Sequence, residues 1–219
     1  MTSTRLLLKT CAAGAIAMAL AGCTAVAQTI LAPRPDLTKF YLLTPSAGTA
    51  APAAVQSVGG DFAIGLGPIK LPLYLDRPEV VTRPAPNRLE LSKDARWGES
   101  LQNGFTSVMA RDLATQAGTR RVIVFPWYNT VHIDFQIQID VYRFETDGQG
   151  TAQLSAKWTI LDSTGKNILY TAESNLTQPS KPGDTTDAAA ALSQTVGDLS
   201  GQIANMLHQV RSQQGAHPA

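Results

Sequence analysis

Residues 131–141 read Val-His-Ile-Asp-Phe-Gln-Ile-Gln-Ile-Asp-Val, and this stretch decides the fold. Apolar side chains occupy the odd positions and polar side chains the even ones. Because successive side chains of a β-strand point to opposite faces, this period predicts a strand with one buried and one wet face. The alternation changes phase near Tyr142-Arg143-Phe144, where we predict a β-bulge.

Two further strands are expected directly after this one. Asp147-Gly148 marks a turn, and apolar residues then alternate over 154–160. A second tight turn is expected at 162–165, followed by a strand over 168–176. The pattern therefore predicts a three-stranded antiparallel meander.

Apolar residues at steps of three and four predict two helices, one before the meander and one after it. The first runs from about Ser92 to Ala117, with Ser92 or Asp94 as its cap and Gly118 as its left-handed exit. The second follows two prolines and is capped by Asp184, Thr185 or Asp187. Its apolar stripe consists of Leu192, Val196, Leu199, Ile203, Met206, Leu207 and Val210.

Shorter apolar runs predict the remaining strands. They are residues 39–43, 61–66 (ended by Gly67-Pro68), 79–83 with 88–91 as a hairpin, and 121–125. The expected class is α/β, with α+β left open: a single domain in which two main helices flank a mixed β-sheet. The expected segments are a signal at 1–22, a tether at 23–38, a domain at 39–212 with a flexible loop at about 44–60, and a tail at 213–219.

The N-terminal residues have the pattern of a secretory signal. Arg5 and Lys9 are followed by an uncharged run at 11–21, which is shorter than the roughly 20 apolar residues of a membrane span. The run ends in Leu20-Ala21-Gly22-Cys23, which resembles the lipobox of bacterial lipoproteins. The resemblance implies cleavage before Cys23 and covalent acyl chains on its thiol. The alternative is an ordinary signal that leaves Cys23 as a free thiol.

Thr24 follows the cysteine where a retention signal would have Asp. By resemblance to sorted lipoproteins, this favours the periplasmic face of the outer membrane. The charges, 18 Lys+Arg against 17 Asp+Glu, argue against a nucleic-acid binder. Of the two cysteines, Cys11 leaves with the signal and Cys23 is acylated, so neither a disulfide nor a cysteine metal site is expected. No cofactor beyond the acyl chains is expected.

Catalytic motifs find little support. Ser163 and Lys166 have the Ser-x-x-Lys spacing of penicillin-recognising enzymes, but that chemistry needs a helix and these residues fall in an expected turn. His132 and Asp134 share one strand face and have the residue types of a base and its orienter. A solvated polar face is the favoured interpretation of this pair, and we expect no enzyme.

Residues 65–83 read Gly-Leu-Gly-Pro-Ile-Lys-Leu-Pro-Leu-Tyr-Leu-Asp-Arg-Pro-Glu-Val-Val-Thr-Arg. Together with 40–43, 87–90, 96–99 and 124–127, this stretch resembles the ABC-type transport auxiliary lipoprotein family, of which the paraquat-inducible protein C type is the best known. The resemblance covers roughly residues 38–210. It implies an α/β domain beside an ABC transporter and a mammalian-cell-entry (MCE) protein, docking lipid or organic-solvent traffic at the outer membrane. A homo-oligomer is an expectation from this analogy alone.

The segment from Tyr74 to Arg83 has two interpretations. An exposed aromatic beside arginines is typical of interface hot spots, so Tyr74, Leu75, Asp76, Arg77, Arg83 and Trp127 are the candidate partner-interface residues. Alternatively, Tyr74 and Leu75 fill the core while Asp76 and Arg77 form a local ion pair. Trp97 is expected in the core.

Three functions follow for the whole chain. The leading hypothesis is a non-catalytic lipoprotein that docks an MCE-type complex. The second is a periplasmic lipid-binding carrier that acts on its own, with a cavity between sheet and helices. The third is an envelope hydrolase that uses His132 and Asp134.

Overall fold

The structure, a computed structural model, describes residues 37–46, 62–128 and 130–216. The expected signal at 1–22, Cys23 and all but the end of the tether lie outside these residues, as does the expected loop beyond Ser46. The elements described below belong to one unit that begins at Thr38. Within the described ranges, we find no helix with both the length and the apolar character that a membrane span requires.

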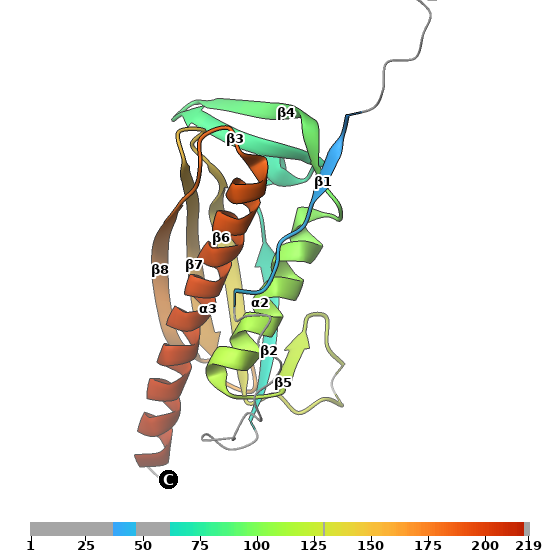
Figure 1. Cartoon of the computed structure of the whole chain (residues 1–219). Helices are drawn as coiled ribbons and strands as arrows, with labels where there is room; N and C mark the ends of the chain where they lie inside the picture. Colours follow the sequence, from blue (N-terminus) through green and yellow to red (C-terminus); the bar gives the residue numbers. More distant parts are fainter. Residues whose placement is uncertain (1–36, 47–61, 129, 217–219) are drawn as a thin grey trace, which may run out of the picture. The chain divides into compact units, whose positions relative to one another are not determined.

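Eight strands form one mixed sheet (Figure 1). Six of them follow the order β1-β4-β3-β6-β2-β5; β7 also pairs with β6, and β8 pairs with β7. The pairs β1–β4, β2–β5, β2–β6 and β3–β6 are parallel, and the others are antiparallel. The strands are β1 (Lys39–Tyr41), β2 (Ala63–Lys70), β3 (Glu79–Ala85), β4 (Arg88–Trp97), β5 (Arg121–Val124), β6 (Phe135–Thr146), β7 (Thr151–Leu161) and β8 (Ile168–Pro179).

Two helices, α2 (Leu101–Ala117) and α3 (Thr185–Ala216), cover one face of this sheet (Figure 1). α2 packs on β2 and β5, and α3 packs on β6, β7 and β8. The expected α/β class is therefore confirmed. Asp184 caps α3 by accepting hydrogen bonds from the N–H groups of Thr186 and Asp187, and the helix continues beyond the expected domain end at 212.

The meander and its bulge are confirmed. β6, β7 and β8 pair antiparallel along their length, and the β6–β7 register shifts between Val141 and Arg143. The strand itself begins only at Phe135, although the apolar alternation begins at Val131. The alternation continues outside the strand because Ile133 packs from the preceding loop over Gly65, where a Cβ would lie 3.0 Å from its Cδ1.

The prediction of a helix start at Ser92 or Asp94 was wrong. Residues 88–97 instead form β4, which pairs with β3 through Glu79 and Arg96, and the helix begins after Ser100, whose hydroxyl accepts from the N–H of Asn103. Trp97 and Leu101 are four apart and both buried, which gives helical spacing across a strand–helix junction. The left-handed exit at Gly118 is confirmed, with φ 67°.

The predicted break at Gly67-Pro68 was also wrong, because β2 continues to Lys70. Gly67 has φ 122°, and its pairing with β6 shifts register between Leu66 and Ile69. A Cβ at this glycine would lie 2.7 Å from the Cβ of Phe125, so the strand passes close to the end of β5 only because no side chain is present. The break signal thus marks an irregularity inside the strand.

The core lies between the helices and the sheet. Phe105 of α2 and Phe144 of β6 meet edge to face, with ring centroids 5.2 Å apart, and both are almost fully buried. Trp97 is 7% exposed, so its expected core position is confirmed. The apolar stripe of α3 is buried, with Met206 only partly so.

Candidate partner interface

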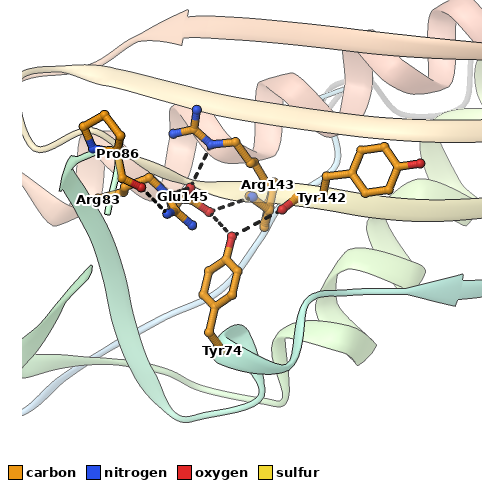
Figure 2. Close-up of polar contacts among 7 residues, drawn as sticks. Tyr74, Arg83, Pro86, Tyr142, Arg143 and Glu145 are labelled. Atoms are coloured by element: carbon orange, nitrogen blue, oxygen red, sulfur yellow. Dashed lines mark hydrogen bonds and ion pairs between the residues drawn. The ribbon is translucent and has the colours of Figure 1, made fainter. Parts of the chain in front are cut away.

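The carboxylate of Glu145 is the centre of a polar network on the sheet face opposite the helices (Figure 2). Its side chain is 0% exposed. It accepts hydrogen bonds from the Tyr74 hydroxyl (2.7 Å), Arg83 Nε (2.6 Å), Arg143 Nε (3.1 Å) and the Phe144 N–H (3.0 Å). Four donors therefore surround one carboxylate that has no access to water.

Three parts of the chain supply these groups. Tyr74 lies in a 3-10 turn, Leu73–Leu75, which Pro72 precedes and which buries Leu75 to 3% exposure. Arg83 lies on β3. Arg143 and Glu145 lie on β6 directly after the bulge, where the register shift makes Tyr142 an extra residue. The bulge therefore sets which β6 side chains face Tyr74 and Arg83.

The electrostatics of the network favour an ionised carboxylate. Burial raises the pKa of Glu145, but the hydrogen bonds from Tyr74, Arg83 and Arg143 outweigh it and leave this pKa below its ordinary value. Burial, and then the hydrogen bond to the anionic Glu145, raise the pKa of Tyr74 to about 12. At neutral pH the network thus holds two guanidinium ions, one carboxylate and a neutral phenol.

The candidate interface residues of the 74–83 segment are only partly brought together. Tyr74 and Arg83 meet at Glu145, and the Arg83 guanidinium lies 5.2 Å from the Tyr74 ring centroid. Leu75 is in the core, while Asp76 is exposed and Arg77 half-buried. In the part of the chain that the structure describes, no ion pair joins Asp76 to Arg77. The interface role of these residues stays a prediction.

Trp127 lies elsewhere. Its indole packs against Phe125, with ring centroids 5.2 Å apart, and over Gly65, where a Cβ would lie 3.1 Å from the indole Cη2. Gly65 pairs with Gln136, at the opposite end of β6 from Glu145. Trp127 is half-buried and does not join the network.

Sequence reasoning missed Glu145, Arg143 and Tyr142. Glu145 follows the buried Phe144, so strand alternation places it on the opposite face. By this pattern alone, Glu145 is indistinguishable from an ordinary acid exposed to water. Its burial depends on Tyr74 and Arg83, which are 71 and 62 residues away along the chain. The one local signal was the predicted bulge, because bulges often re-aim side chains beside functional sites.

The residues considered for catalysis lie outside the Glu145 network. His132 is 71% exposed, and its Nε2 lies 3.0 Å from Oδ1 of Asp134, whose Oδ2 accepts from the Ala63 N–H at 2.7 Å. Burial raises the pKa of Asp134, but the Ala63 N–H and His132 outweigh this and lower it. Ser163 and Lys166 lie in the turn between β7 and β8. Among the residues that the structure covers, no group of three or more His, Cys, Asp or Glu is placed to hold a metal ion.

Comparison with solved structures shows the same fold. Protein XCC0632 from Xanthomonas campestris is 19% identical, with a TM-score of 0.64 over 82% of this chain and 100% of that chain. An uncharacterised protein is 15% identical, with a TM-score of 0.61 over 78% of this chain and 98% of that chain. No curated protein matches the sequence. The family model described as "ABC-type transport auxiliary lipoprotein component" matches residues 41–204, and the chain belongs to this family.

Proposed function

We propose that this chain is a non-catalytic outer-membrane lipoprotein subunit of an ABC/MCE-type intermembrane transport system for lipid or organic solvent. It docks the periplasmic MCE component at the outer membrane. The observation that carries this proposal is the family match, which extends over residues 41–204 and so includes nearly the whole domain.

The anchor is the second part of the proposal. Cys23 carries the acyl chains and holds the domain at the periplasmic face of the outer membrane. Each buried methylene contributes about 0.8 kcal/mol, so two or three chains anchor a protein stably where one would not. The lipobox at 20–23 and Thr24 support this placement.

The absence of catalysis is supported by where the polar residues lie. His132 is mostly exposed, and Asp134 is tied to the backbone of β2. The N–H of Lys166 donates to Asp162 Oδ1 within a turn, which does not give the helical geometry of a Ser-x-x-Lys site.

A self-sufficient lipid carrier has less support. A carrier needs an apolar cavity, and the space between α3 and the meander is filled by side chains that are 0–2% exposed. These include Leu192, Val196, Leu199 and Ile203 from the helix and Leu154 and Ile160 from β7. Such close packing is that of an ordinary protein core.

The test is a cross-linked pull-down from native envelopes with a tag after Ala219, analysed by mass spectrometry. We expect an MCE protein or its permease to be recovered with the acylated chain. The matched control is Cys23→Ala, which removes the acyl acceptor. This variant should be absent from the outer-membrane fraction, and no transport component should be recovered with it. Recovery of no transport component by the acylated protein would refute the docking role.

A further inference from the structure

The two arginines beside Glu145 are not fully used by it. Arg83 and Arg143 each donate through Nε to the same carboxylate oxygen, Oε1. Arg83 Nη1 also donates to the Pro86 carbonyl at 3.1 Å. The Arg83 side chain also interacts with the Tyr74 hydroxyl. In the described ranges, the two terminal nitrogens of Arg143 have no protein acceptor. One buried negative charge therefore holds two positive charges in place and leaves N–H donors over.

These donors border a surface cleft of about 480 Å³. Arg83 and Arg143 line it together with the end of β3 (Pro84, Ala85), with Pro86 of the turn that follows, and with Asp147, Gln149 and Gln153. Figure 2 shows both guanidinium groups beside the Glu145 carboxylate, with Pro86 next to Arg83. Because Glu145 is 0% exposed while the Arg143 side chain is 37% exposed, a molecule that enters the cleft meets the cations and not the buried anion.

Asp147, an acid in the lining of the cleft, does not neutralise the arginines by direct contact. Asp147 Oδ1 accepts hydrogen bonds from the N–H groups of Gln149 (2.8 Å) and Thr151 (3.0 Å), which tie it into the β6–β7 turn. Among the described ion pairs, none joins Asp147 to Arg83 or Arg143. The terminal N–H groups of Arg143 are thus available to an acceptor from outside the chain.

The bulge also exposes an aromatic ring, Tyr142, which points away from the two guanidinium groups (Figure 2). Tyr142 is 50% exposed and directly precedes Arg143, and Leu73, 86% exposed, directly precedes Tyr74. A second surface hollow, of about 560 Å³, has Tyr142 in its lining, with Leu71 and Pro72. Neither arginine lines this second hollow, so Tyr142 and Arg143, which are neighbours in the chain, line two different hollows. Arginine and tyrosine are the residue types of protein-binding hot spots.

We propose that the cleft lined by Arg83 and Arg143 binds a carboxylate from an acidic segment of the partner protein, and that this segment continues to the separate hollow lined by Tyr142. Guanidinium groups recognise carboxylates through paired N–H donors, and the arginines here are already held by Glu145 before the partner arrives. The proposal rests on the proposed function only in that a protein partner exists, and it adds the surface and the chemistry of contact.

The test uses the full acylated chain with the photo-reactive residue benzoylphenylalanine at position 142, cross-linked in native envelopes. We expect an adduct to one protein, through a peptide that contains Asp or Glu. Arg143→Gln should lower the adduct yield about tenfold or more, as expected when one partner of a charge pair is lost. The matched control is Arg111→Gln, which makes the same charge change on an exposed position of α2 and should leave the yield unchanged.

Because Arg143 also supports Glu145, Arg143→Lys is measured as well. It keeps the charge and removes the planar donor pair, so the yield should fall by about threefold or more. A phospholipid adduct, no adduct, or yields equal to wild type in both Arg143 variants would overturn the proposal. If the adduct depends on Arg143 but joins a protein that is not a transport component, this binding surface stands and the proposed function is refuted. If the adduct joins an MCE protein but does not depend on Arg143, the proposed function stands and this binding surface is refuted.

Discussion

The two faces of the sheet are built on different principles. The face under α2 and α3 is filled with apolar side chains such as Phe144, Leu154 and Ile160. The opposite face has polar side chains throughout the meander, and the buried acid Glu145 on this face is held by residues from three separate elements. The first face supplies the free energy of folding through buried apolar area. On the second face, the buried hydrogen bonds to Glu145 fix the positions of two arginines.

The largest expected effect comes from the covered face. Phe105→Ala removes a fully buried ring that packs edge to face on Phe144. We expect the free energy of unfolding to fall by about 3–5 kcal/mol, the usual cost of a large-to-small change with a residual cavity. Urea unfolding followed by the fluorescence of the buried Trp97 and Trp158 measures it. A loss below 1 kcal/mol would mean that the helix layer is not the main source of stability.

A smaller effect is expected from the centre of the open face. Glu145→Gln keeps the shape and removes the charge that both arginines share, so the free energy of unfolding at pH 7 should fall by about 2 kcal/mol. Its matched control is Glu90→Gln, because Glu90 pairs with Arg88 where both side chains are more than half exposed. We expect the control to change stability by no more than about 0.5 kcal/mol. Equal effects of the two variants would contradict the network.

The pH dependence of the same variant sharpens this comparison. The pKa of Glu145 lies below its ordinary value of 4.5 in the folded protein, so the unfolded chain takes up the proton first as the pH falls. The stabilisation from the charge is therefore complete above about pH 4.5 and is lost below it. The difference between wild type and Glu145→Gln should be constant near neutrality and should narrow in acid.

Tyr74→Phe tests a single hydrogen bond of the network, the one from the Tyr74 hydroxyl to Glu145. It removes the 2.7 Å hydrogen bond to Glu145 and keeps the ring under Arg83, so we expect a loss of about 1 kcal/mol at pH 7. The pKa of Tyr74 is raised from 10.0 to about 12, so the unfolded chain loses this proton first and the wild type loses stability between pH 10 and 12. Unfolding curves across this range should show that loss in the wild type and less of it in Tyr74→Phe.

How much the sequence predicts follows the same division. The meander, its bulge and α3 were predictable because a strand or helix that buries one face repeats that face at a fixed period. Residues 88–97 were partly misassigned because their structure comes from pairing with β3, and the apolar residues 97 and 101 happen to have helical spacing. The spacing of apolar residues within one segment does not show whether that segment pairs with a distant strand.

The candidate site shows the same limit more sharply. Tyr74 and Arg83 were chosen for their residue types, and the structure brings these two to Glu145. Leu75 and Trp127 were chosen on the same grounds and lie in the core and at the far end of β6. Residue type indicates which side chains suit an interface, but only the fold decides which of them face the same cleft.

The smallest expected effect concerns His132, which tests whether the far end of the open face does chemistry. The side chain is 71% exposed and its hydrogen bond to Asp134 is open to water, so His132→Ala should change the free energy of unfolding by less than about 0.5 kcal/mol. The cellular phenotype of a strain that depends on the protein should be unchanged too. Loss of function with unchanged stability would instead revive the hydrolase hypothesis. A null result would leave the Arg83–Arg143 cleft as the part of this face where function is to be sought.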